Sequence, residues 1–160
     1  MVTNEDVIEA ENTAINCNTV NKLELAVKNF NNCSLKSTSK NVVFADGNNK
    51  ADLMVIGDNP ETLDINNLKS FQGEVGFLLL AMLKAIDFDG NNTYFTNMFF
   101  CPYTKGKKPI LEDVLDNVNL VKKQVEIIAN KLIKKNKEYD VIVHCVGGAL
   151  GVRGAFPKIK

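Results

Sequence analysis

The stretch that decides the fold is LMVIGDNPETLDINNLKSFQGEVGFLLLAML, residues 53–83. Its first four residues form a continuous apolar run, which is typical of a strand buried on both faces of a sheet. A turn containing Asp58 and Asn59 follows, then a polar loop, and then residues 72–86, whose apolar pattern predicts a helix. A buried strand that leads into a helix predicts an α/β fold.

Segments on both sides of this stretch continue the alternation of strand and helix. The predicted elements are a helix over residues 19–32 capped by Thr19, a short strand within 41–47, a strand over 93–97, an amphipathic helix over 111–132 and a third buried strand over 140–148. Together they predict a three-layer α/β/α arrangement around a central, mainly parallel sheet. In such sheets ligands bind beyond the carboxyl ends of the strands.

Composition limits the class of protein. With 160 residues, 45% of them hydrophobic, the chain suits a single domain, expected over residues 19–160 after a flexible polar leader over residues 1–18. Nineteen basic and nineteen acidic residues cancel, so contact with nucleic acid would need a local basic patch. The four cysteines show no CxxC spacing and the chain starts with polar residues, which predicts a cytoplasmic protein. No run approaches the roughly 20 apolar residues of a membrane span, so we expect no contact with a membrane.

Polar side chains follow the strands at the edge where ligands bind. Asp58 and Asn59 come directly after the first buried strand, where a carboxylate can orient water or stabilise positive charge and an amide can bind a polar ligand. The alternative is that both residues only form the turn before Pro60. Asn97, at the end of YFTN, could bind a base edge or satisfy local backbone groups.

Phe71 lies at the entrance of the predicted helix, between polar residues and two glycines that permit close approach. It could stack on a ligand or pack into the core as a hydrophobic staple. Lys105, Lys107 and Lys108 lie on a loop at the same sheet edge and suit phosphates, the alternative being a solvated charged loop. His144 is the only histidine, and its apolar strand favours a place in the core over catalysis.

Four segments occur in a fixed order: CSLKSTSKNVVFADGN (33–48), GDNPE (57–61), SFQGEVGFLL (70–79) and YFTNMFFCPYTKGKKP (94–109). They resemble, in turn, the motifs C-x-L-x-x-T-x-x-N-x-V-F-x-x-G-N, G-E-A/G-P-G, P-F-V-G-x-x-G-x-L-L and Y-I-T-N-x-x-x-C-R-P-P-G-N-R-x-P of the family 4 uracil-DNA glycosylases. The spacing from Gly57 to Phe71 is preserved, and the resemblance covers residues 30–148. It implies hydrolysis of the N-glycosidic bond of uracil in DNA, a reaction of base excision repair.

The resemblance also implies a role for each matching residue. Asp58, in the place of the family's Glu, and Asn59 would lie near the glycosidic bond as catalytic residues. Phe71 would stack on a flipped-out uracil, Asn97 would hydrogen-bond its Watson–Crick edge, and Gly57 would line the pocket. The loop with Lys105, Lys107 and Lys108 would contact the DNA backbone. Glu61 departs from the motif, in which a glycine is usual.

The resemblance implies further departures outside the pocket. The family's iron–sulfur cluster has four cysteine ligands, whose positions here hold Phe30, Cys33, Cys101 and Asn117, so we predict neither a cluster nor another metal. The family continues to another strand and an H-P-S motif, whereas this chain ends with GALGVRGAFPKIK. The chain is therefore either a fragment of a longer protein or a shortened relative. We expect a monomer that lacks the last strand and takes uracil-containing DNA as partner. The alternative is a nucleic-acid or nucleotide-binding module that has lost hydrolysis.

Overall fold

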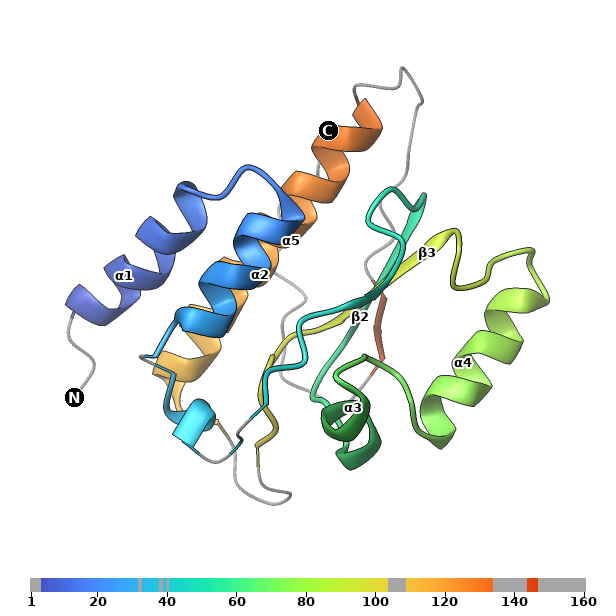
Figure 1. Ribbon diagram of the computed structural model, residues 1–160, viewed down its shortest axis with the longest axis horizontal. Coiled ribbons are helices and arrows are strands. Elements are labelled where there is room, and N and C mark those ends of the chain that lie inside the picture. The colour runs from blue at the N-terminus through green and yellow to red at the C-terminus, as the bar shows by residue number, and fades with distance from the viewer. Residues whose placement is uncertain are drawn as a thin grey trace.

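The computed structural model describes residues 4–31, 33–37, 39, 41–103, 109–133 and 144–146. Within these residues one sheet has the strand order β1-β3-β2-β4, and Figure 1 shows α1, α2 and α5 on one side of the strands and α3 and α4 on the other. The strands are β1 (Asp46–Gly47), β2 (Leu53–Gly57), β3 (Thr93–Asn97) and β4 (His144–Val146). The helices are α1 (Asn4–Ile15), α2 (Val20–Asn29), the 3-10 helix η1 (Ser34–Ser37), α3 (Thr62–Asn67), α4 (Glu74–Lys84) and α5 (Leu111–Ile133).

The sheet is mixed, with β2 at its centre. β2 pairs in parallel with both β3 and β4, whereas the two-residue β1 pairs antiparallel with β3. The α/β class is therefore confirmed, while the missing last strand stays a prediction. The register places Gly57 opposite Asn97. Because parallel strands end at the same edge of a sheet, the loops that leave β2 and β3 begin side by side.

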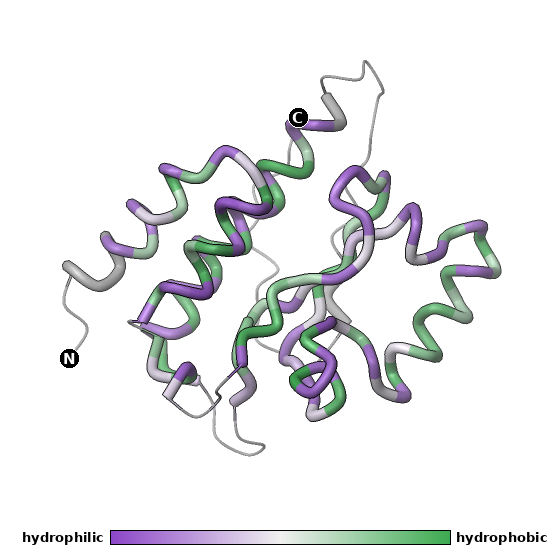
Figure 2. The backbone as a smooth tube through the Cα atoms, viewed as in Figure 1, coloured by the Kyte–Doolittle hydropathy of each residue, from purple (hydrophilic) through white to green (hydrophobic). Residues whose placement is uncertain are grey.

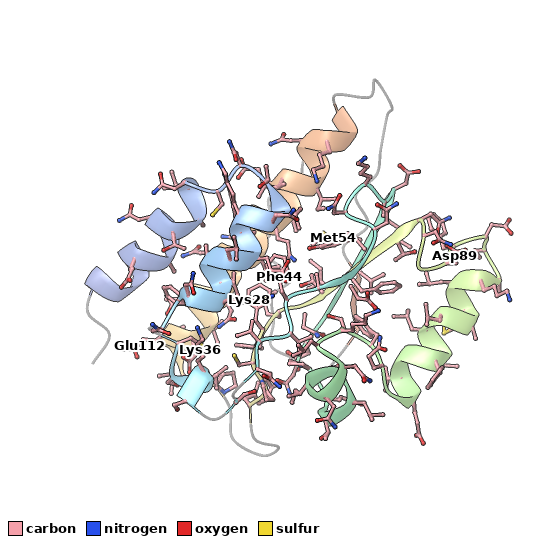
Figure 3. All side chains as sticks on the ribbon, viewed as in Figure 1. Lys28, Lys36, Phe44, Met54, Asp89 and Glu112 are labelled. Carbon is pink, nitrogen blue, oxygen red and sulfur yellow. The ribbon has the colours of Figure 1, made fainter. Side chains whose placement is uncertain are left out.

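Two sets of apolar side chains cover the two faces of the sheet, since successive residues of a strand point to opposite faces. Met54, Ile56 and Tyr94 belong to the larger core cluster, which includes buried residues of α1, α2 and α5. Val55 and Phe95 belong to a smaller cluster with Leu83 of α4. Phe44, labelled with Met54 in Figure 3, stacks on Phe100 within the larger core, with ring centroids 5.5 Å apart.

Helix α2 forms where the sequence predicts it. The hydroxyl of Thr19 accepts a hydrogen bond from the backbone N–H of Lys22 at 3.2 Å, which satisfies one of the free donors of the first turn. The helix ends at Phe30, whose N–H donates to the carbonyl oxygens of Ala26 and Val27. Beyond it, Lys36 Nζ donates to the carbonyl oxygens of Lys28 and Phe30, where the negative end of the helix dipole favours a cation (Figure 3).

Helix α1 differs from the loose polar leader expected for residues 1–18. Residues 4–15 are helical, and Ala10 and Ala14 are buried in the core that α2 and α5 share. Cys17 is also buried there, and its thiol donates to the carbonyl oxygen of Thr13 at 3.2 Å. The expectation is wrong for residues 4–15, where the buried side chains of Ala10 and Ala14 are small and give a weaker hydrophobic signal than larger apolar residues would.

Helix α3 occupies part of the segment expected to be a polar loop. Its start is held by Asp64, whose Oδ2 accepts a hydrogen bond from the Glu61 backbone N–H at 3.0 Å. Its end is marked by Leu68, which has a left-handed backbone with φ 55° and donates its N–H to the carbonyl oxygen of Asp64. A six-residue helix is too short for a clear 3.6-residue period, so local capping rather than apolar spacing defines it.

Helix α4 contacts the sheet through Leu79 and Leu83, while the buried Gly76 lies against the backbone of Phe71. Figure 2 shows hydrophobic residues over most of this helix, yet Phe77 is 71% exposed and Met82 is 63% exposed. The helix is therefore apolar well beyond the face that it buries. Across the described residues, no helix combines the length and apolar character needed to span a membrane.

Candidate active site at the ends of β2 and β3

Backbone hydrogen bonds join the loops that leave β2 and β3. The N–H of Met98 donates to the carbonyl oxygen of Gly57 at 2.7 Å, and the N–H of Phe99 donates to that of Asp58 at 3.0 Å. These bonds join the two chain segments where the strands end. They hold Asp58 and Asn59 at the sheet edge, as the sequence predicts.

Tyr103 binds both of these polar side chains. Its phenolic hydroxyl donates to Asp58 Oδ2 at 2.7 Å, and its backbone N–H donates to Asn59 Oδ1 at 3.0 Å. Its ring contacts the ring of buried Phe99 edge-on, with centroids 5.2 Å apart and an interplanar angle of 80°. Burial raises the pKa of Tyr103 to about 12, aided by the hydrogen bond and charge of Asp58.

A cleft of about 890 Å³ opens beside these residues. Helix α3 forms one wall of the cleft, and the start of α4 forms another. Its volume is in the range of sites for small molecules and single nucleotides. The residues that carry polar or aromatic groups into its lining are Asp58, Asn59, Glu61, Thr62, Asp64, Phe71 and Tyr103.

Phe71 lines the cleft in an unusual backbone conformation. Its φ is 60°, in the left-handed region that bulky residues rarely adopt. A Cβ atom at Gly76 would overlap the carbonyl group of Phe71, so only glycine lets α4 come this close. The ring packs at an angle of 59° against Phe95, with centroids 5.7 Å apart. The sequence left two alternatives for Phe71, stacking on a ligand and packing on the core. Both are compatible with its ring, which lies between the cleft and the sheet.

Gly57 brings two predicted uracil-binding residues together. A Cβ atom at this position would overlap Asn97 Oδ1 and would lie 2.7 Å from Phe71 Cζ, so both side chains pack directly over the glycine. Asn97 is only 2% exposed and is not among the residues that line the cleft. Its Nδ2 donates a long bond of 3.5 Å to Ser70 Oγ. The amide therefore lies beneath the surface, next to the Phe71 ring.

Two functional candidates in the cleft were missed by sequence reasoning. Tyr103 lies in the segment CPYTKGKKP, where the lysines drew attention, although an aromatic hydroxyl at the same sheet edge was a signal in its own right. Asp64 is buried, and its Oδ1 accepts a hydrogen bond from the Gln72 backbone N–H at 2.6 Å. Because Asp64 also binds the Glu61 N–H, it ties both ends of the loop that carries α3.

Other predicted residues lie outside the cleft or outside the described residues. Lys105, Lys107 and Lys108 belong to the residues that are not described, so the basic loop stays a prediction. His144 lies in β4 opposite Val55 of β2, and its side chain is not described.

The four positions where the resemblance implies cluster ligands form a closed, hydrogen-bonded region in this structure. Phe30 and Cys101 are buried, and Asn117 Nδ2 donates to Cys33 Sγ at 3.6 Å and to the carbonyl oxygen of Asp113 at 2.7 Å. Burial raises the pKa of the Cys33 thiol and raises that of Cys101 to about 11. The cavity among them measures about 20 Å³, room for about one water molecule.

These residues do not fit an iron–sulfur cluster. Such a cluster needs four thiolates, whereas a phenyl ring and an amide take two of the four positions, Phe30 and Asn117. Elsewhere in the described part of the chain, no three His, Cys, Asp or Glu side chains gather as metal ligands.

Comparison with known proteins shows the family to which the chain belongs. The Uracil DNA glycosylase superfamily matches residues 44–134, which include β2, β3, the cleft and all of α5. The chain belongs to this superfamily. It is similar to the Type-4 uracil-DNA glycosylase of Archaeoglobus fulgidus, with 30% identity over 101 residues, covering 63% of this chain and 51% of that protein.

Two other relatives carry the same description. The Type-4 uracil-DNA glycosylase of Saccharolobus solfataricus is 30% identical over 109 residues, covering 67% of this chain and 50% of that protein. The Type-4 uracil-DNA glycosylase of Pyrobaculum aerophilum is 28% identical over 93 residues, covering 58% of this chain and 47% of that protein. The resemblance to family 4 uracil-DNA glycosylases is thereby confirmed. The aligned part spans about half the length of each relative.

Proposed function

We propose that this protein hydrolyses the N-glycosidic bond of uracil in DNA. The observation that carries the proposal is the cleft at the ends of β2 and β3, in which a carboxylate, an amide and an aromatic ring stand together on Asp58, Asn59 and Phe71. Membership of the Uracil DNA glycosylase superfamily supports uracil as the base and DNA as the partner. Base excision repair is the process that such a reaction serves.

The chemistry follows from the groups on the walls. Cleavage between base and sugar develops positive charge on the deoxyribose, and the Asp58 carboxylate would stabilise that charge or direct water to it. The ring of Phe71 would stack on the extruded uracil, which recovers part of the stacking lost when a base leaves the helix. Asn97 would bind the base edge after a small movement of the Phe71 ring, because the amide is now buried beside it.

We also propose that the reaction proceeds without an iron–sulfur cluster. Phe30 and Asn117 support this, since one fills space and the other hydrogen-bonds a cysteine where ligands would be needed. The protein should bind no stoichiometric iron or acid-labile sulfide after anaerobic reconstitution. Incorporation of both, with visible charge-transfer absorption, would contradict this part of the proposal.

The reaction is tested with oligonucleotides that contain one uracil, single-stranded and paired with guanine, followed by alkaline treatment that breaks abasic sites. Strand breaks should appear with the unaltered protein, and Asp58→Asn should slow their formation by at least about 100-fold. Glu126→Gln removes an exposed carboxylate from α5, outside the cleft, and should leave the rate unchanged. Binding of the oligonucleotide without strand breaks would instead indicate a binding module that has lost hydrolysis.

A further inference from the structure

Tyr103 is the residue that joins the two predicted catalytic side chains. One of its donors, the phenolic hydroxyl, binds Asp58 at 2.7 Å, and the other, the backbone N–H, binds Asn59 at 3.0 Å. The first distance is typical of a hydrogen bond between a hydroxyl group and an oxygen acceptor. Because only the side-chain bond depends on the tyrosine, substitution by phenylalanine separates the two contacts.

The place of the Tyr103 ring is determined by its surroundings. The ring contacts Phe99 edge-on, and Phe99 is fully buried. The same Phe99 donates its backbone N–H to the carbonyl oxygen of Asp58. The ring and the backbone of Asp58 are therefore fixed to one anchor, so the hydroxyl reaches the carboxylate from a defined direction.

The hydrogen bond restricts the Asp58 side chain. An aspartate at a strand end has free rotation about two side-chain bonds unless a partner fixes it. With Oδ2 bound by the hydroxyl, the other oxygen, Oδ1, remains for water or for positive charge in the cleft. A phenol of ordinary pKa is already protonated, and therefore a donor, through the neutral range.

We propose that Tyr103 is the positioning residue for Asp58, presenting one carboxylate oxygen to the sugar of the bound nucleotide. The inference rests on the proposed glycosidic-bond hydrolysis, but it can be tested without turnover. A positioned carboxylate favours a cation at the place of the sugar over a neutral group of the same shape. Loss of the positioning hydroxyl should reduce that preference without weakening contact with the rest of the DNA.

The first measurement is binding to two oligonucleotides, one with a cationic pyrrolidine abasic analogue and one with the neutral tetrahydrofuran analogue. The unaltered protein should bind the cationic oligonucleotide about 10-fold more tightly. Tyr103→Phe should reduce this preference to about twofold and leave the affinity for the neutral oligonucleotide unchanged. Asp58→Asn should abolish the preference. Tyr94→Phe removes a hydroxyl of the same kind that binds Gln124 in the core, and should keep the preference.

The second measurement is single-turnover excision of uracil. Tyr103→Phe should slow it about 10-fold, the loss expected when a hydrogen bond to a charged group is removed. In the Asp58→Asn background the same substitution should have no further effect, because a residue that acts through Asp58 has nothing left to position. Circular dichroism and thermal unfolding establish that each variant is folded.

The outcomes separate the two proposals. If the protein excises no uracil but its preference for the cation depends on Tyr103 and Asp58, hydrolysis fails and the positioning role stands. The positioning role is overturned if Tyr103→Phe matches the unaltered protein both in its preference for the cationic oligonucleotide and in its rate of excision. It is also overturned if Tyr103→Phe slows excision by the same factor with Asp58 present as in the Asp58→Asn background. A protein with neither excision nor preference for the cation contradicts both.

Discussion

Two regions next to the sheet edge share one segment of chain and are built in opposite ways. The cleft region, formed by Asp58, Asn59, Phe71 and Tyr103, presents polar and aromatic groups to open space. The closed region, formed by Phe30, Cys33, Cys101 and Asn117, surrounds a cavity of about 20 Å³. Cys101 and Tyr103 are two residues apart in the segment that links them.

The difference between the open cleft region and the closed region shows how the segment from Phe99 to Tyr103 is held in place. In the closed region, two hydrogen bonds hold the backbone of Phe100. Its N–H donates a long bond of 3.4 Å to Asn117 Oδ1, and its carbonyl oxygen accepts a bond of 2.8 Å from the Val43 N–H. On the cleft side, Tyr103 is held by Phe99 and Asp58. The segment is thus anchored on both sides by contacts within the chain.

The largest effect is expected in the cleft region from Gly76→Ala. Alanine normally favours a helix over glycine by about 1 kcal/mol, but here its Cβ would overlap the Phe71 carbonyl group, so a net loss of about 3 kcal/mol in unfolding free energy is expected. Gly90→Ala is the matched control, because nothing lies within 4 Å of the added atom. Chemical denaturation measures both, and equal stabilities would show that α4 can move away from Phe71.

In the closed region, Asn117→Ala should cost about 2 kcal/mol of unfolding free energy. The buried amide has three hydrogen-bond partners, and its loss leaves the Phe100 N–H without its acceptor. Asn130→Ala changes an exposed residue on the same helix and should alter stability by less than about 0.5 kcal/mol. Uracil excision per folded molecule should persist in both variants. A loss of excision in folded Asn117→Ala would mean that the two regions are coupled.

A smaller effect is expected at the start of α2, the helix that carries Phe30 into the closed region. Thr19→Ala removes the acceptor for the Lys22 N–H and should lower the unfolding free energy by about 1 kcal/mol. Thr19→Ser keeps an acceptor and should come close to the unaltered protein. A full loss with serine would assign the effect to the threonine methyl group rather than to the cap.

The smallest effect concerns the pH dependence of the Tyr103 hydrogen bond. The pKa of Tyr103 rises from 10.0 to about 12 on folding, so the folded state holds the phenolic proton more tightly than the unfolded state. The stability contributed by this group is therefore complete below about pH 10 and is lost as pH rises towards about 12. The difference in thermal unfolding between the unaltered protein and Tyr103→Phe should shrink over that range. A difference that stays constant would contradict the assigned hydrogen bond.

Local sequence patterns determined much of the fold. The apolar runs and helical spacings predicted β2, β3, α2, α4 and α5, because each element shows its period within a few residues. The same patterns placed Asp58 and Asn59 at the sheet edge, since strand ends follow directly from strand positions, whereas the family resemblance pointed to Phe71. Helix α1 and helix α3 were missed, because small buried alanines and a single capped turn leave little apolar period.

The tertiary structure alone decided what these residues touch. The Tyr103 hydroxyl meets a carboxylate 45 positions earlier in the chain, and Asn117 meets a thiol 84 positions earlier. The burial of Asn97, the left-handed backbone of Phe71 and the antiparallel pairing of β1 likewise arise from packing between distant segments. Sequence periods report only which face of an element is apolar, whereas contacts between elements depend on how the whole chain fills its core.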